Sequence, residues 1–179
     1  MSVFRTYIQP LLFDGRTYTQ GNVVDLLNTY KVACQEFPFK KFPKPKDLPS
    51  RDWSGDDGLD VYVPSTLPMK EYDMEVTFIY VGTELSIRAD LSNFIDFLYG
   101  RNTVASGVVR GARLAVYDEH VGMGRKDVVV SEVENTLFHL VPGFDSDAIA
   151  QFKVKFTVYD PVTPVTANYT NGVCTSLSF

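Results

Sequence analysis

Most of the regular patterning in this chain has the period of a β-strand. In YDMEVTFIYVG, residues 72–82, every second side chain is large and apolar, as in a strand with one buried face. AIAQFKVKFTVYDP, residues 148–161, has the same period, and its Asp-Pro ending predicts where the strand stops. ARLAVYDE and KDVVVSEVE, residues 112–119 and 126–134, predict a hairpin joined by the Gly-rich loop 121–127.

One stretch has the period of a helix. In LSNFIDFLYG, residues 91–100, apolar side chains recur at i, i+3, i+4 and i+7. Asp90 predicts the N-cap of this helix, and Gly100 predicts its end. The helix and the two strongest strands predict the core: Met74, Val76, Phe78, Leu91, Phe94, Leu98, Phe152, Val154, Phe156 and Val158.

The two ends of the chain are patterned less clearly. VFRTYIQPLLFDGRTY, residues 3–18, predicts a short strand that breaks at Pro10, followed by a turn at residues 14–15. Alternation over residues 30–35 predicts one further strand. The polar tail, residues 163–179, predicts either a loose arm or an edge strand.

Strands around a single helix predict an α+β fold, mainly antiparallel β, in which one short helix covers a β-sandwich or barrel. The chain has 179 residues, so we expect one domain over residues 1–179. Its 13 Phe and 10 Tyr favour strands over helical bundles.

A long connection, residues 37–68, lies between the N-terminal strands and the regular patterns. Its prolines exclude a helix or a central strand: Pro38, Pro43, Pro45, Pro49, Pro64 and Pro68. Connections of this length are usually functional or disordered. Apolar side chains predict that this one is anchored rather than disordered: Phe37, Phe39, Phe42, Trp53 and Tyr62.

Opposite charges are segregated within this connection, because lysines come first and aspartates follow, with the only tryptophan between them. The two groups either fold back on each other within one chain or meet their complements on a second copy. The sequence leaves both alternatives open. The candidate interface comprises Lys40, Lys41, Phe42, Lys44, Lys46, Arg51, Asp52, Trp53, Asp56, Asp57 and Asp60.

Net charge and cysteine content narrow the function class. A formal net charge of -5 argues against a nucleic-acid binder. No apolar run approaches the ~20 residues that cross a bilayer, and no signal-peptide pattern begins the chain. We therefore expect a soluble protein without a membrane anchor, made in a reducing cytoplasm, with Cys34 and Cys174 as free thiols.

The acidic residues do not match a calcium-binding loop. Counting from Asp52, the loop pattern requires glycine where Asp57 stands and glutamate where Val63 stands. A turn built on Gly55 and Gly58 is therefore favoured over a metal site, with a looser cation site as the alternative.

Patterns typical of phosphate binding, zinc binding and catalysis are also missing from the sequence. Residues 122–127 lack the glycine and Gly-Lys-Ser/Thr positions of a phosphate loop, so they predict a hairpin tip with Arg125 and Lys126 facing water. His120 falls in a polar turn, and His139 falls in an apolar run that favours a half-buried structural histidine. No Cys or His pair has zinc-binding spacing. We expect no enzymatic activity, no metal and no cofactor.

A carbohydrate-binding β-sandwich module is an alternative from another class. Such modules stack sugar rings on aromatic side chains, and Trp53, Tyr62, Tyr72 and Tyr99 are candidates. That function requires these aromatics to be exposed together on one flat face. Otherwise they seal the irregular connection onto the sandwich.

Three stretches occur in a distinctive order. The Pro-rich connection leads into the turn RDWSGDDG, residues 51–58; the strand EVTFIYVG follows at residues 75–82; and a helix and a hairpin precede a final F-x-V-x-F-x-x-x-D-P strand at residues 152–161. Over roughly residues 20–162, this order resembles the tail-tube fold of bacteriophages. In particular it resembles the N-terminal domain of distal tail proteins, where an Arg-Asp-Gly-like turn precedes the corresponding strand.

The resemblance implies a structural virion protein of a phage or prophage tail, made in the bacterial host cytoplasm. It implies a ring, expected to be a homohexamer, that joins the tail tube to the baseplate. Its partners would be itself and other tail or baseplate proteins, with DNA only as cargo in the channel. The second, galectin-like domain of larger distal tail proteins has no counterpart in these residues, so a tail tube protein is a close alternative.

Overall fold

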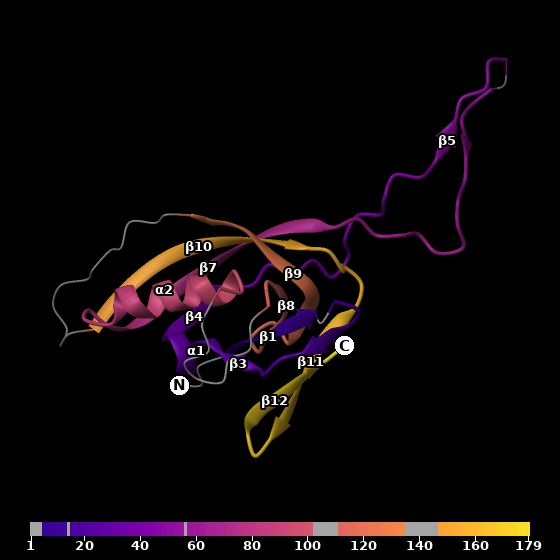
Figure 1. Ribbon diagram of the computed structural model, residues 1–179. Helices are drawn as coiled ribbons and strands as arrows, with labels where there is room; N and C mark the ends of the chain where they lie inside the picture. Colours follow the sequence, from indigo (N-terminus) through magenta and orange to yellow (C-terminus); the bar gives the residue numbers. More distant parts are fainter. Residues whose placement is uncertain (1–4, 14, 56, 102–110, 135–146) are drawn as a thin grey trace.

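A ten-stranded antiparallel sheet carries the fold in the computed structural model, which describes residues 5–13, 15–55, 57–101, 111–134 and 147–179 (Figure 1). The main path through this sheet is β2-β1-β8-β9-β10-β7-β4. The strands on this path are β1 (Thr6–Phe13), β2 (Tyr18–Gln20), β4 (Val32–Glu36), β7 (Tyr72–Thr83), β8 (Arg113–Asp118), β9 (Met123–Glu134) and β10 (Asp147–Val158).

The remaining elements attach to this path. β3 (Val24–Asp25) pairs with β1, and β11 (Pro164–Thr170) pairs with both β9 and β12 (Val173–Ser178). In the described ranges, the helices α1 (Leu26–Tyr30) and α2 (Ile87–Leu98) accompany the sheet. A separate two-stranded ribbon is formed by β5 (Ser50–Arg51) and β6 (Asp60–Val61). The fold is α+β and mainly antiparallel β, as the sequence predicts.

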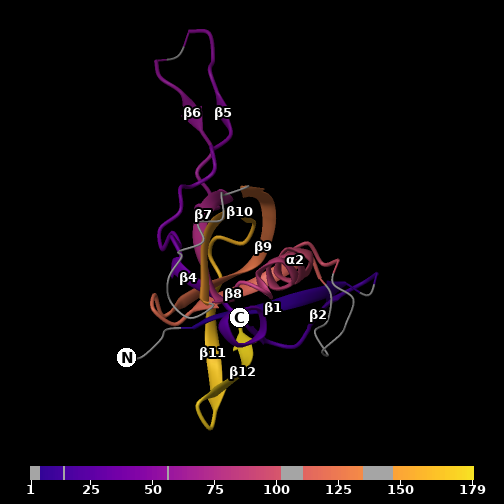
Figure 2. The ribbon, with the colours of Figure 1, turned by 90° about the vertical axis from the view of Figure 1, so that its left-hand side faces the viewer.

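The sheet is strongly bent, so that β7 and β10 arch over α2, β1 and β8 (Figures 1 and 2). The main core fills the space between these layers. Phe78 on β7 lies at its centre, with ring centroids 5.4 Å from Phe94 of α2 and 5.7 Å from Phe152 of β10. Ile8 and Val116 close the core from β1 and β8.

The predicted core is confirmed, because all ten of its residues are buried. Each of the strands β7 and β10 turns alternate side chains inward and places polar ones on the opposite face. On that outer face, Lys153 pairs with Glu75 at 2.5 Å, and Lys155 pairs with Glu132 and Glu134 at 3.0 Å. One face is therefore apolar and packed, and the other is charged and solvated.

β1 does not break at Pro10, contrary to the prediction. The strand continues to Phe13, and Pro10 pairs with Leu114 of β8. On the other side of β1, Pro10 faces the connection 21–23 between β2 and β3. There the Pro10 carbonyl accepts a hydrogen bond from the Gly21 amide at 2.8 Å, and no N–H of Pro10 is needed. The missing N–H of proline is tolerated because no ladder partner requires it there.

The helices also depart from the prediction. Tyr30 belongs to the unpredicted helix α1, which Asp25 caps by accepting the Asn28 amide at 3.1 Å. α2 begins at Ile87, before the predicted start, and Asp90 lies in its first turn, where it accepts the hydroxyl of Tyr80 at 2.8 Å. The predicted end is confirmed, since Gly100 follows the helix with φ +67°.

The Gly-rich loop after β8 is shorter than predicted. β9 already begins at Met123, and Arg125 is buried rather than facing water. Lys126 is half-buried and pairs with Asp160 at 3.4 Å. A register shift between β8 and β9, with Asp127 at φ +54°, marks a β-bulge that turns the Arg125 side chain inward.

The backbone of β8 lies directly against Gly124 of β9, and we expect Gly124→Ala to destabilise the protein. A Cβ at this position would overlap the backbone carbonyl oxygen of Val116. Relieving that overlap requires a shift between paired strands, which costs about 1–3 kcal/mol of unfolding free energy. Urea denaturation measures this loss. Gly122→Asn is the control, because Gly122 has open space around it and a left-handed φ of +66° that asparagine tolerates. Equal losses in the two variants would contradict the prediction.

The polar tail forms the edge hairpin β11–β12 rather than a loose arm. Val165 and Leu177 are buried against Tyr7 and Leu11 of β1 in a second, smaller core cluster. Partial burial, together with a hydrogen bond from its hydroxyl to Glu119 at 2.8 Å, raises the pKa of Tyr169.

A candidate interface on the projecting arm

The connection between β4 and β7 leaves the body of the protein as a long, narrow arm (Figures 1 and 2). The arm, residues 40–70, is rooted by two stacked aromatic rings: Phe37 is buried in the core, and Phe39 lies 4.8 Å from it between ring centroids. Phe37 also contacts Phe78 and Phe156, at centroid distances of 6.1 and 6.2 Å. The predicted anchoring of this segment is therefore confirmed at its root.

Backbone pairing stiffens the arm at two levels. Near the base, Pro45 bridges to Met69, the Lys46 amide donates to Pro68 at 2.7 Å and the Lys70 amide donates to Lys44 at 2.8 Å. Farther out, β5 pairs with β6. Between these two levels the outgoing and returning sides of the arm differ in length, and prolines interrupt the backbone pairing. The two paired regions therefore belong to one irregular ribbon.

The outer end of the arm is a turn that carries aspartates and the tryptophan. Gly55 and Gly58 take the positive φ values of +109° and +94° that this turn requires, as the sequence predicts. The guanidinium of Arg51 stacks over the Trp53 ring at 3.5 Å. The tip, residues 52–60, holds four of the candidate interface residues at its described positions: Asp52, Trp53, Asp57 and Asp60. Asp56 lies outside the described residues.

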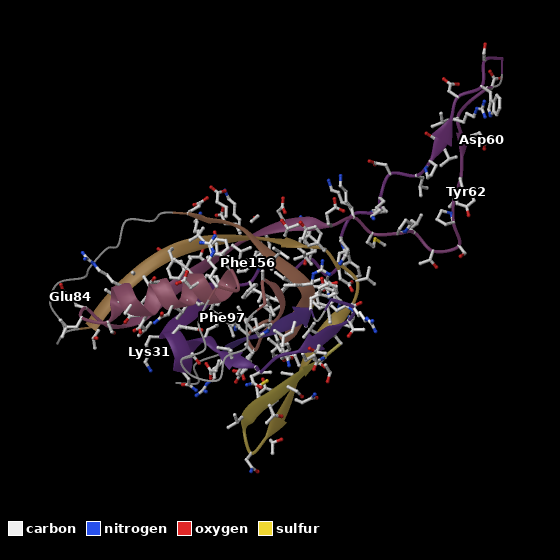
Figure 3. All side chains as sticks on the ribbon, in the orientation of Figure 1. Lys31, Asp60, Tyr62, Glu84, Phe97 and Phe156 are labelled. Carbon is white, nitrogen blue, oxygen red and sulfur yellow. The ribbon has the colours of Figure 1, made fainter. Side chains whose placement is uncertain are left out.

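Apolar side chains along the arm have no contact with the core. Phe42 is 86% exposed and Tyr62 is 69% exposed, so neither anchors the arm to the body as the sequence suggested. Val63 and Leu59 are 64% and 57% exposed. Figure 3 shows Tyr62 and Asp60 far from the body, in contrast to the buried Phe156. Large apolar side chains are therefore exposed along one projecting element.

The two charge groups predicted from the sequence lie at opposite ends of the arm. Lys40, Lys41 and Lys44 are at the base, and Lys46 lies one residue above the Pro45 bridge. Among the described residues, no ion pair joins any of these lysines to an aspartate of the tip. The ribbon between them holds the two groups apart.

Three further residues belong to this region, although the sequence did not assign them to it: Lys70, Tyr72, which was a candidate only for sugar stacking, and Arg125, which was expected to face water. The Lys40 amide donates to the Tyr72 hydroxyl at 3.2 Å, and Arg125 Nη2 donates to the Lys40 carbonyl at 3.0 Å. Lys70 reaches the base because its amide pairs with Lys44 across the ribbon. Only the alternation that places Tyr72 on the buried face was visible in the sequence, because the other contacts join distant segments.

The aromatics considered for sugar binding do not share one face. Tyr72 is buried, Trp53 and Tyr62 lie on the arm, and Tyr99 follows the end of α2, where Arg101 approaches its ring at 5.4 Å. This arrangement lacks the flat aromatic platform that a carbohydrate-binding module requires.

The groups considered for catalysis are dispersed. His120 is exposed in the turn after β8, where its amide donates to Asp118 at 3.0 Å, and His139 lies outside the described residues. Both cysteines are free thiols, and burial raises the pKa of Cys174 to about 11, so its thiol stays protonated at neutral pH. Within the described ranges, no group of three or more His, Cys, Asp or Glu side chains is arranged to hold a metal ion. No helix of the described chain is long and apolar enough to cross a membrane.

Fold and site together define an α+β protein, mainly antiparallel β, with a stiff, polar-tipped arm that carries exposed apolar side chains. No family model, no curated protein and no solved structure matches this chain.

Proposed function

We propose that this protein is a structural subunit of a phage or prophage tail and assembles into a ring through its arm. The observation that carries the proposal is the arm itself, which extends from a well-packed body and leaves large apolar side chains in water. Exposed apolar surface of this kind is typical of a site that a neighbouring subunit covers. The element order that resembles the tail-tube fold supports the choice of a tail protein.

The contact that we propose is head-to-tail. The arm of one subunit contacts a different surface on its neighbour, and the arm of that neighbour contacts a third subunit, so the contact is heterologous rather than the reciprocal contact of a two-fold dimer. Repeated heterologous contacts close into a ring when the rotation between subunits permits it, and otherwise they run on as a filament. A ring with a central channel is what a tail component requires.

Within the tail, we place the protein at the junction of tube and baseplate, as a distal tail adaptor of six copies. Its neighbours would be other tail and baseplate proteins, and DNA would only pass through its channel. The role is mechanical and requires no catalytic step. A tail tube protein is the alternative, and it differs in stacking ring upon ring.

Electron microscopy of the purified protein, together with sedimentation velocity over a range of concentrations, tests the proposal. We expect closed rings of about six copies, the closed cyclic assembly that heterologous contacts form. Single rings favour the adaptor, and stacked rings favour the tube. A protein that stays monomeric at the highest concentration, or forms only two-fold dimers, would contradict the proposed function.

A further inference from the structure

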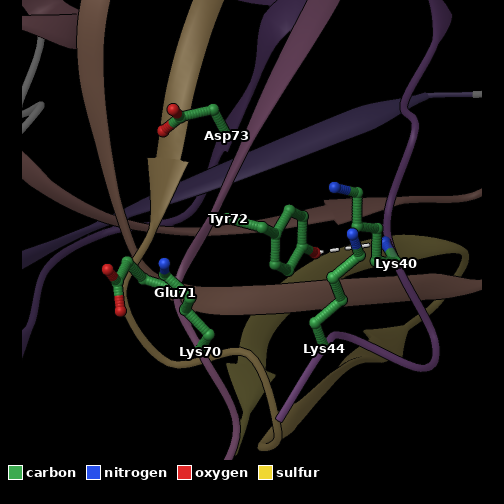
Figure 4. Close-up of a pocket in the computed structure, with 6 residues that line it drawn as sticks. All are labelled: Lys40, Lys44, Lys70, Glu71, Tyr72 and Asp73. Carbon is green, nitrogen blue, oxygen red and sulfur yellow. Dashed lines mark hydrogen bonds between the residues drawn. The ribbon is translucent and has the colours of Figure 1, made fainter. Parts of the chain in front are cut away.

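An open pocket lies at the base of the arm, where the arm joins β7. Its volume is about 440 Å³, and its lining consists of Lys40, Lys44, Lys70, Glu71, Tyr72 and Asp73. Figure 4 shows the amines of Lys40 and Lys44 beside the Tyr72 ring. Pockets of roughly 300–1,000 Å³ are the usual size for binding sites, so this one has room for side chains of a bound segment.

The ammonium groups of this pocket have no carboxylate partner within the described part of the chain. Lys40 Nζ lies over the Tyr72 ring instead, 5.1 Å from its centroid. Of the two carboxylates in the lining, Asp73 accepts the Thr157 hydroxyl at 2.7 Å, and Glu71 is exposed. The unpaired lysine charges favour an anionic occupant.

Arg125 adds a buried positive charge behind the pocket. It is only 3% exposed, and its contacts are the carbonyls of Lys40 at 3.0 Å and Gly124 at 3.4 Å, while Nε has no hydrogen-bond partner. No carboxylate pairs with it among the described residues. A buried charge without a counter-ion increases the gain from an anion bound nearby.

The tip of the arm carries the complementary charge. Asp52, Asp57 and Asp60 are exposed and make no ion pair with any other described residue. Asp52 comes eight residues after Lys44 on the ribbon, and eight extended residues span about 25 Å. Because the ribbon is paired at two levels, the tip cannot fold back to its own base.

We propose that the basic pocket at the base of each arm receives the acidic tip of the arm of a second copy. This inference rests on the proposed ring function and names the surface that the arm contacts. The lysines at the base and the aspartates at the tip have opposite charges, but the tip cannot reach the base of its own arm. The two groups can therefore pair only between different chains. Repeated from subunit to subunit, this contact is heterologous and generates a ring or a filament.

A second copy fits the pocket better than a nucleic acid. Glu71 and Asp73 in the lining would repel a continuous phosphate backbone, and the whole chain has a net charge of -5. Separate carboxylates on a turn can approach the lysines while avoiding these two residues. The exposed Phe42 beside the base and Trp53 at the tip offer apolar contacts that a nucleic-acid backbone would not use.

Cross-linking between two versions of the full-length protein tests the contact directly. One version carries Asp57→Cys at the tip, and the other carries Lys44→Cys in the pocket together with an affinity tag. We expect a short bis-maleimide linker to join the two chains at least about tenfold faster than it joins Asp57→Cys to a Lys41→Cys version, because pocket docking raises the local concentration of the two thiols. Lys41 is the matched control, since it lies in the same lysine group but does not line the pocket. Protein without introduced cysteines accounts for the native thiols. Equal rates for Lys44→Cys and Lys41→Cys would overturn the proposal.

Charge reversal gives an independent test. We expect Lys44→Glu/Lys70→Glu to weaken assembly about tenfold, and Lys41→Glu/Lys46→Glu, with the same change in net charge, to weaken it less than about threefold. Mixing the pocket variant with Asp57→Lys/Asp60→Lys should partly restore mixed assemblies, as sedimentation measures. An oligonucleotide retained by the wild type and lost by the pocket variant, without preferential cross-linking, would assign the pocket to nucleic acid instead.

The outcomes separate this inference from the proposed function. Rings that form equally well in the wild type and in the pocket variant would overturn the pocket contact and leave the ring function standing. Preferential cross-linking at Lys44 without closed rings would support the contact and count against the ring.

Discussion

Phe156→Ala is expected to lower the free energy of unfolding by about 3–5 kcal/mol, the usual range for truncating a buried phenylalanine. Phe156 is fully buried on β10, and its ring centroid lies 6.2 Å from that of Phe37 and 6.4 Å from that of Phe78. Truncation would leave a cavity between β10, β7 and the root of the arm. Chemical denaturation measures the loss.

Tyr159→Ala is the matched control for this prediction. Tyr159 follows the end of β10 and is 55% exposed, so its truncation should change the unfolding free energy by less than about 1 kcal/mol. A loss below about 1 kcal/mol for Phe156→Ala would mean that the inward face of β10 has been misassigned. Because Phe156 also contacts the root of the arm through Phe37, the variant protein should assemble less well even where it remains folded.

Removing the outer arm is expected to abolish assembly while the body stays folded. In this variant, Asn-Gly replaces residues 47–67 and joins Lys46 to Pro68, which already pair across the ribbon. None of the described residues in the removed segment is buried, so the unfolding free energy should change by no more than about 1 kcal/mol. The deletion removes the acidic tip together with the exposed Trp53 and Tyr62, while Phe42 at the base remains.

Sedimentation velocity and electron microscopy measure the assembly state of this shortened protein, and thermal unfolding measures its stability. Rings identical to those of the wild type would show that the arm is not the contact between subunits. A shortened protein that fails to fold would show that the arm supports the body, contrary to its lack of buried residues. Substituting Phe42 and Tyr62 by Ser in the full-length chain separates these cases, because both side chains are mostly exposed.

The described side chains suited to acid-base or nucleophilic chemistry are scattered rather than gathered at one site. His120 lies on an exposed turn, and the Cys174 thiol is buried with a pKa raised to about 11. These positions give no nucleophile paired with a base in a common cavity.

The sequence determined those parts of the fold that depend on local periodicity. Alternation along β7 and β10 identified the buried face because neighbouring side chains of a strand point to opposite sides, whatever the strand pairs with. Gly100 marked the end of α2 because a positive φ is a local requirement. The chain also revealed that residues 37–68 form an unusual connection, and it located the two charge groups within it.

The tertiary structure decided what depends on partners distant in sequence. Pro10 fits inside β1 because the facing connection requires no N–H, and α1 is too short, at 5 residues, to show a helical period. Arg125 is buried because a β-bulge between β8 and β9 turns it inward, which alternation alone does not anticipate. Above all, the pairing of Lys44 with Lys70 sets lysines at the base of a ribbon and leaves aspartates at its tip. Charge order along the chain could not distinguish an internal ion pair from that separation, because the distance between the groups is fixed by pairing across the arm.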